Sequence, residues 1–142
     1  MNVVLDTNVL VSVAINPKGP PSDIIKAWKA GRFSWVTSLP LLEELGRVLS
    51  SRRLERYLVW SSQEVKEFVG LAAEVATVVE PRRTIDVIAE DSADNLVLEA
   101  AAEAEADCIV SGDSHLLSLG EFEGIPILSP VRFLAALREL EP

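Results

Sequence analysis

The chain has 142 residues, of which 49% are hydrophobic and 25% charged, a balance typical of one folded domain and not of a disordered chain. Its formal net charge of −9 argues against non-specific nucleic-acid binding over the whole surface, because neutralisation of phosphates by Lys and Arg supplies most of that affinity. No apolar run approaches the roughly 20 residues that a membrane helix requires, and the amino terminus has no basic stretch before an apolar one, so we expect neither a membrane span nor a signal peptide.

The first part of the chain predicts two strands, each followed by helices. The strands are predicted at residues 2–5, where two valines and a leucine follow an asparagine, and at residues 33–37, which are rich in aromatic and β-branched side chains. The run Asn-Pro-Lys-Gly-Pro-Pro at residues 16–21 predicts a loop. Ser22 and Asp23 then fit the cap and first turn of a helix that stops at a glycine. Apolar residues at helical spacing predict two further helices, one beginning within residues 6–8 and one after Ser38.

The second part of the chain continues the alternation of helices and strands. Ser61 and Glu64 fit a capping box that opens a helix, and a strand is predicted at residues 75–79. A polar run at residues 90–95 precedes a helix rich in Ala, Glu and Leu that reaches about residue 106. Beyond it, the pattern predicts strands at residues 108–110 and 125–128, a short helix around residues 116–117 and a closing helix over residues 131–140.

Alternating strands and helices indicate a mostly parallel sheet covered on both faces. We therefore predict an α/β fold, a three-layer α/β/α sandwich with a Rossmann-like sheet, in a single domain over residues 1–142. Cys108 is the chain's single cysteine and lies in an apolar run, so we expect a buried thiol in a cytoplasmic protein, with neither an internal disulfide nor a Cys/His metal site. Trp28, Trp35 and Trp60 fit either the core, as we expect for at least two of them, or an interface.

Carboxylates at four separate places are the candidates for a functional site. Asp6 and Asp113 each follow an apolar strand, so both should point into the crevice at the carboxyl ends of the strands. Asp94, with Asp91 beside it, flanks a helix start, and Glu44 lies on the helix after the second strand. Carboxylates brought to one point raise each other's pKa unless a cation neutralises them. Together they predict a site for a hard divalent cation such as Mg²⁺ or Mn²⁺, which binds oxygen ligands.

Each carboxylate taken alone also has a simpler interpretation. An aspartate at a helix start is often only a cap, which applies to Asp91, and Asp113 fits a turn before the next helix. Glu44 fits a solvated residue or an ion pair with Arg47, one turn away. Asp6 is the hardest to explain in this way, because a buried strand has little structural need for Asp-Thr-Asn at its end. The combination of the four places carries the prediction.

Four motifs, in order along the chain, resemble the PIN domain family. They are Leu-Asp-Thr-Asn-Val-Leu around Asp6, Leu-Glu-Glu-Leu-Gly-Arg-Val-Leu around Glu44, Asp-Ser-Ala-Asp-Asn-Leu-Val-Leu-Glu-Ala-Ala around Asp94 and Val-Ser-Gly-Asp-Ser-His-Leu-Leu around Asp113. Within the family, the chain is similar to the VapC-like toxin components of prokaryotic toxin–antitoxin systems. The resemblance covers nearly the whole chain and implies a PIN-like fold and a metal-dependent ribonuclease.

The resemblance also implies a role for each matching residue. It implies an acidic catalytic quartet that binds one or two Mg²⁺ or Mn²⁺ ions, formed by Asp6, Glu44, Asp94 and Asp113. Asp91 matches an additional acidic position that contacts the metal through water. Asn8 and Ser111 match polar positions that support the site. Glu43 is the alternative to Glu44, which we prefer because the family's glutamate directly precedes a leucine, as here.

Several partners are expected. The resemblance implies an RNA substrate, a cognate antitoxin that blocks the toxin, and a homodimer. His115 either touches a phosphate or is an ordinary, partly exposed residue in the first turn of a helix, which is the commoner case. The basic residues available for phosphate contacts equally fit a solvated surface; they are Arg47, Arg52, Arg53, Arg56 and Lys18.

Two other functions are compatible with parts of the sequence. One is a partner-binding module of the same family with little free nuclease activity. The other is a Mg²⁺-dependent phosphatase or phosphoacceptor domain, because both place an aspartate at a strand end. The phosphatase pattern needs a second aspartate two residues after the first, but Asn8 stands there. The phosphoacceptor pattern needs an adjacent acidic pair early in the chain, which this sequence lacks. The nuclease therefore ranks first.

Overall fold

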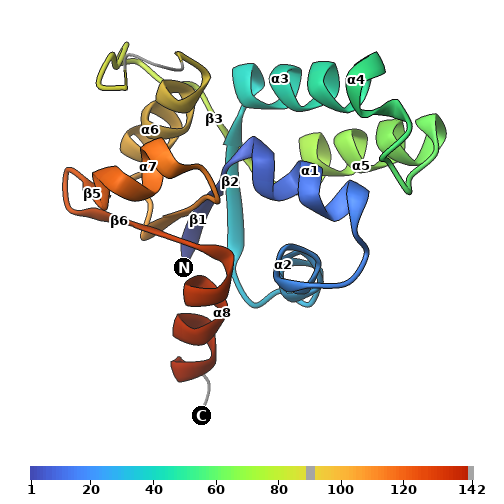
Figure 1. Ribbon diagram of the computed structural model, residues 1–142. Helices are drawn as coiled ribbons and strands as arrows, with labels where there is room; N and C mark the ends of the chain where they lie inside the picture. Colours follow the sequence, from blue (N-terminus) through green and yellow to red (C-terminus); the bar gives the residue numbers. More distant parts are fainter. Residues whose placement is uncertain (89–91, 141–142) are drawn as a thin grey trace.

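Parallel strands run through the centre of the computed structural model, which describes residues 1–88 and 92–140 (Figure 1). Six strands within these residues form one sheet in the order β3-β2-β1-β4-β6-β5. Neighbouring strands are parallel except for β5, which pairs antiparallel with β6. The strands are β1 (Asn2–Leu5), β2 (Ser34–Ser38), β3 (Thr77–Val79), β4 (Cys108–Val110), β5 (Glu121–Phe122) and β6 (Ile125–Leu128).

Helices cover both faces of the sheet. Side chains alternate along β1, so that Val3 and Leu5 belong to one hydrophobic cluster and Val4 to another. Helices α1, α2, α5 and α8 pack on the first cluster, and α6 and α7 pack on the second, which confirms the predicted three-layer sandwich. The helices are α1 (Thr7–Ile15), α2 (Pro20–Lys29), α3 (Leu39–Leu49), α4 (Arg52–Glu55), α5 (Ser62–Val75), α6 (Ser92–Ala104), α7 (Ser114–Leu119) and α8 (Pro130–Glu139).

The strand predictions agree closely with the structure. Strands β1, β4 and β6 have the predicted bounds, and β2 is displaced by one residue. Ser38 both ends β2 and caps α3, where its hydroxyl accepts a hydrogen bond from the N–H of Leu41 (3.3 Å). The third strand is shorter than predicted because Val75 still belongs to α5.

Helix starts follow their capping residues, with one correction. Ser61 and Glu64 form both hydrogen bonds of the capping box at α5, as predicted. Helix α2, however, begins at Pro20 and not after Ser22, so the predicted loop is too long. Proline is tolerated in the first turn because its missing N–H would have no helical acceptor there. Ser22 instead donates to the carbonyl of Asn16 (2.8 Å).

Two short elements, α4 and β5, were not predicted. Helix α4 has four residues and β5 has two, too few for either to show a period. The hairpin between β5 and β6 turns at Glu123 and Gly124, which have φ values of 50° and 83°. Positive φ at both central residues is the geometry of a type I′ turn, for which Glu-Gly is a weak sequence signal.

Core predictions for the sulfur and indole side chains are confirmed. Cys108 is buried, and burial raises the pKa of its thiol to about 12. Trp28 and Trp35 are buried edge to face, with ring centroids 5.0 Å apart, and Trp60 packs against the margin of the same cluster. In the described part of the chain, every helix is too short or too polar to cross a membrane.

Candidate functional site

The carboxyl ends of β1 and β4 place Asp6 and Asp113 at the same edge of the sheet. The two strands are adjacent and parallel, with Leu5 opposite Val110, and the N–H of Asp6 donates to the Val110 carbonyl (2.9 Å). The buried Ser111 hydroxyl donates to Asp6 Oδ2 (2.6 Å) and accepts from the N–H of Asp113 (2.9 Å). One hydroxyl group therefore fixes the spacing of two carboxylate positions that are far apart in sequence.

Asn8 connects the first turn of α1 to the loop after β4. Its Oδ1 accepts a hydrogen bond from the N–H of Gly112 (3.3 Å). Helix α1 begins directly after Asp6, so backbone N–H groups lie beside that carboxylate, and the N–H of Thr7 bonds to it. Asn8 and Ser111 therefore both hold together the two loops that carry Asp6 and Asp113.

The first turn of α6 brings Asp94 to the same edge, and Asn95 holds that turn in place. Both residues are buried. Asn95 Oδ1 accepts hydrogen bonds from the N–H groups of Val87 (3.1 Å) and Ile88 (2.9 Å), and its Nδ2 donates to the Ile88 carbonyl (2.8 Å). No role of Asn95 is predicted from the sequence, in which its position beside Asp94 in a polar run is the available signal.

Helix α3 contributes a carboxylate from the other side. Glu44 is only 8% exposed, whereas Glu43 is exposed. Glu44 lies three residues after the buried Leu41 and four before Val48, which also lines the cleft, so helix geometry places it on that side of α3. Its burial excludes the interpretation of Glu44 as a solvated surface residue and favours it over Glu43 for the site.

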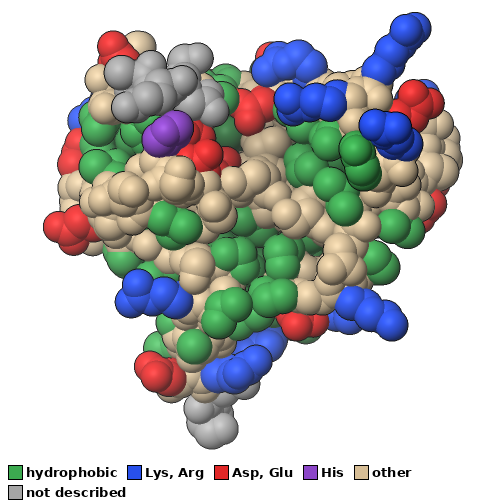
Figure 2. Space-filling model, viewed as in Figure 1, with side chains coloured by type: hydrophobic (Ala, Val, Ile, Leu, Met, Phe, Trp, Pro, Cys, Tyr) green, Lys and Arg blue, Asp and Glu red, His purple; other side chains and the backbone are tan. Residues whose placement is uncertain are grey.

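A cleft of about 400 Å³ brings these places together. Its walls include four carboxylates, from Asp6, Glu44, Asp94 and Asp113. Thr7, Asn8, Ser12 and Arg53 line it as well. In Figure 2, acidic side chains lie in the hollow between the α6–α7 side and the α3–α4 side, and basic side chains gather over α3 and α4. The predicted quartet therefore shares one cavity with a basic rim.

The surroundings of Asp6 in the cleft disfavour the ionised form of its carboxyl group. Burial raises the pKa of this carboxyl to about 6, and repulsion from Asp113 and Glu44 adds to the rise. The hydrogen bonds from the Ser111 hydroxyl and the Thr7 N–H lower the pKa and offset part of the effect. An additional positive charge in the cleft would therefore stabilise the ionised form of Asp6.

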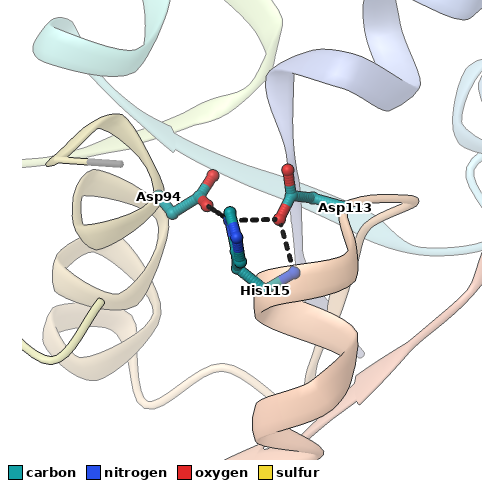
Figure 3. A group of neighbouring side chains, drawn as sticks. All are labelled: Asp94, Asp113 and His115. Carbon is teal, nitrogen blue, oxygen red and sulfur yellow. Dashed lines mark hydrogen bonds and ion pairs between the residues drawn. The ribbon is translucent and has the colours of Figure 1, made fainter. Parts of the chain in front are cut away.

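Three side chains form a close group between α6 and the start of α7 (Figure 3). One side-chain atom each of Asp94, Asp113 and His115 lies within 4.8 Å of the other two. His115 Nδ1 is 3.5 Å from Asp113 Oδ1 and 3.9 Å from Asp94 Oδ2. The backbone N–H of His115 also donates to Asp113 Oδ1 (2.8 Å), which ties this carboxylate to the first turn of α7.

Comparison with known proteins assigns the chain to a family. A sequence profile of the PIN domain matches residues 2–115, which include all four cleft carboxylates. The chain belongs to the PIN domain family. It is 32% identical to the uncharacterized protein MJ1680 of Methanocaldococcus jannaschii over 119 residues, which are 84% of this chain and 75% of that protein. PIN domains are generally nucleases, in agreement with the predicted class of enzyme.

Solved structures share the fold of this PIN domain. VapBC2 from Rickettsia felis, bound to a DNA fragment from their promoter, matches with a TM-score of 0.61 and 12% sequence identity, covering 91% of this chain and 98% of the other. FitAcB from Neisseria gonorrhoeae matches with a TM-score of 0.52, the same identity and the same coverage. At such low identity these similarities show the fold alone.

The donor set of the PIN cleft fits a divalent cation. Four carboxylates line one cavity: Asp6, Asp94 and Asp113 lie at strand ends or helix starts, and Glu44 lies on α3. Carboxylate oxygens are the ligands that hard cations prefer. The raised pKa of Asp6 has the same implication, because a bound cation would offset both burial and the repulsion from neighbouring carboxylates.

Only some of the basic residues predicted to contact phosphate lie at the PIN cleft. Arg53 lines it, and with Arg52 it also lines an adjacent hollow along α4. Arg47 and Lys18 are exposed but do not line the cleft. Asp91, predicted to contact the metal through water, lies outside the described residues.

Proposed function

We propose that this PIN domain is a divalent-metal-dependent ribonuclease and acts in the cytoplasm as the toxin of a toxin–antitoxin pair. The observation that carries the nuclease proposal is the shared cleft, in which carboxylates from four separate segments face one cavity. Carboxylates are gathered in this way where a cation neutralises them, since they otherwise repel one another. Membership of the PIN domain family supports the same class of reaction.

The proposed catalytic group divides into ligands and supporting residues. One or two Mg²⁺ or Mn²⁺ ions would be held by Asp6, Glu44, Asp94 and Asp113. Such ions, when bound, polarise the scissile phosphate and lower the pKa of water. Ser111 keeps Asp6 and Asp113 at a constant spacing through its two hydrogen bonds, and Asn8 holds the loop that contains Gly112.

RNA would approach along the basic side of the cleft. Arg53 stands at the cleft wall, and Arg52 and Arg56 lie beside it on or next to α4. Arg53 shares the cleft with the carboxylates, so a phosphate bound by it would be presented to them in spite of the chain's net charge of −9. In this proposal, α4 positions the substrate and the cleft cleaves it.

The toxin proposal concerns partners. VapBC2 of Rickettsia felis shares the fold at 12% identity, and the VapC-like motifs of this chain point to the same kind of system. A cognate antitoxin and a homodimer are the partners that we propose. The alternative is a partner-binding module with little free nuclease activity. Measurements of RNA cleavage and of growth arrest distinguish it from the toxin.

Substitution of single cleft carboxylates tests the nuclease proposal. Asp94→Asn and Glu44→Gln should each reduce Mn²⁺-dependent cleavage of single-stranded RNA by at least about 100-fold, because removal of a group that acts on the transition state typically costs that much. Glu43→Gln is the matched control, since it makes the same chemical change on the exposed neighbour of Glu44. Circular dichroism should show that all three variants fold. Unchanged cleavage by both cleft variants would refute the proposal.

Expression in a bacterial host tests the toxin proposal. The wild-type chain should arrest growth, and Glu44→Gln should not, because arrest requires cleavage of cellular RNA. Co-expression of the small gene adjacent to this one should restore growth. Arrest by the Glu44→Gln variant would instead show that binding, and not cleavage, causes toxicity.

A further inference from the structure

The histidine beside the cleft residues Asp94 and Asp113 is a feature that the proposed nuclease chemistry has not used. His115 is the chain's single histidine and stands beside two of the proposed ligands. Its side chain is 46% exposed, whereas that of Asp94 is 7% exposed, so the imidazole forms the outer edge of the group. Figure 3 shows its ring directed at both carboxylates.

The distances in this group leave room for an ion between the three side chains. Nδ1 lies 3.5 Å from one carboxylate oxygen and 3.9 Å from the other, longer than a good N–H···O hydrogen bond. Two ligands of one six-coordinate ion, each about 2.2 Å from it, lie about 3 Å apart when adjacent and about 4.4 Å apart when opposite. The two measured distances lie between these values, so small shifts of the side chains would bring the donors around one ion.

Helix α7 also fixes the position of the imidazole. Asp113 is the N-cap of α7, and its Oδ1 accepts the backbone N–H of His115. The same short turn therefore orients the carboxylate and holds the backbone of His115 beside it, so the ring starts from a position within reach of Asp113. A nitrogen donor is thus built into the group and does not depend on a long flexible side chain.

We infer that His115 Nδ1 is a metal ligand together with Asp94 and Asp113, and that this nitrogen makes the centre select Mn²⁺ over Mg²⁺. The inference rests on the proposed function. Mn²⁺ shares the preference of Mg²⁺ for oxygen ligands, but as a first-row transition-metal ion it tolerates an imidazole nitrogen better than Mg²⁺ does. A site of carboxylates alone would give Mg²⁺ less of a disadvantage.

Electron paramagnetic resonance of the untagged protein with MnCl₂ tests the inference. Loss of the sharp signal of free Mn²⁺ gives the affinity, and competition with MgCl₂ gives the selectivity. Pulsed measurements on the bound ion should show coupling to a ¹⁴N nucleus of imidazole type, which can come only from His115 because the chain has one histidine. His115→Asn should abolish the coupling and weaken Mn²⁺ binding by at least about tenfold, with a smaller effect on Mg²⁺.

Two further variants separate the possible outcomes. Ser118→Asn makes a matched change on an exposed position of α7 and should leave the coupling and both affinities unchanged. Asp6→Asn should weaken binding of both ions. If Mn²⁺ binds, is weakened by Asp6→Asn and shows no imidazole coupling, the metal centre stands and the His115 inference is overturned. If Mn²⁺ binding is undetectable, or if it is insensitive to Asp6→Asn and shows no imidazole coupling, both the metal centre and the inference are overturned.

Discussion

At the scale of single residues, stability and function oppose each other at Asp6. The carboxylate is 5% exposed and lies near Asp113 and Glu44, so its charge is unfavourable in the folded protein. The bonds from Ser111 and Thr7 offset only part of this cost, because the pKa still rises to about 6. A metal ligand must nevertheless be ionised, so the metal-free protein carries strain that a cation would relieve.

The pKa of Asp6 predicts how the stability of the metal-free protein depends on pH. Its pKa is about 6 in the folded chain against 3.8 for the ordinary side chain, so between these values the folded state binds more protons than the unfolded state. The free energy of unfolding therefore falls as pH rises through this window, by about 3 kcal/mol in total. Asp6→Asn removes the charge, so with a chelator it should be more stable than wild type at pH 8.

Urea unfolding at two pH values checks this prediction. The advantage of Asp6→Asn should shrink at pH 4.5, where wild-type Asp6 is mostly protonated in the folded state. Asp6→Ala is the control, because it also removes the charge but loses the acceptor of the Ser111 hydroxyl (2.6 Å) and should gain less. An Asp6→Asn advantage that is the same at both pH values would contradict the assigned pKa.

At the scale of elements, the short helix α4 connects the proposed chemistry to the proposed substrate. It has no buried residue and follows α3, which carries Glu44, after only two residues. Arg53 therefore reaches the cleft, whereas Arg52 and Arg56 remain along the adjoining hollow. An element that contributes nothing to the core is free to carry charges that bind RNA, which also explains why hydrophobic periodicity could not predict it.

Neutralising α4 tests its role in RNA binding. In an Asp94→Asn background that prevents cleavage, Arg52→Gln with Arg53→Gln should weaken binding of single-stranded RNA. The slope of log affinity against log salt should become shallower by about 1.4, because each lost phosphate contact contributes about 0.7. Fluorescence anisotropy at salt concentrations from about 50 to about 200 mM measures both the affinity and the slope.

Helix α8 provides the charge-matched control for this experiment. Arg132→Gln with Arg138→Gln removes the same charge from exposed positions on α8, which lies at the opposite end of the molecule from α4 (Figure 1). RNA affinity and salt slope should stay close to those of the Asp94→Asn parent. Equal losses for the two pairs would show that net charge, and not α4, governs binding.

At the scale of the whole molecule, one sheet serves both the core and the cleft. Its two faces carry separate hydrophobic clusters, and each central strand contributes to both. The parallel arrangement brings the carboxyl ends of β1 and β4 to the same edge, where the chain leaves the core and polar residues are tolerated. A single sheet that joins both clusters should also make them unfold together.

Cooperative unfolding is therefore expected and tests whether residues 1–142 form one domain. Trp28, Trp35 and Trp60 all report on the cluster below one face, whereas far-UV circular dichroism reports on helices of both faces. The urea midpoints from tryptophan fluorescence and circular dichroism should coincide. A fluorescence midpoint clearly displaced from the circular dichroism midpoint would show that the two faces unfold separately and would contradict a single domain.

Much of the fold was predictable because its strands are short, apolar and bounded by polar residues. β1, β4 and β6 were located to the residue, and Ser38 and Ser61 marked helix starts by capping. The start of α2 was placed too late because Pro20 reads as a breaker in sequence, although it occupies a first turn where proline costs little. α4 and β5 were missed because neither is long enough to repeat a pattern.

The sequence by itself determined which carboxylates are candidates, since an acidic side chain directly after a buried strand or before an apolar helix is visible in the order of residues. Only the tertiary structure decided that Asp6, Glu44, Asp94 and Asp113 share one cleft, that Glu44 and not Glu43 faces it, and that the His115 ring stands between two carboxylates. The physical reason is that distances between residues about 100 positions apart are set by strand order and helix packing, which local patterns do not encode.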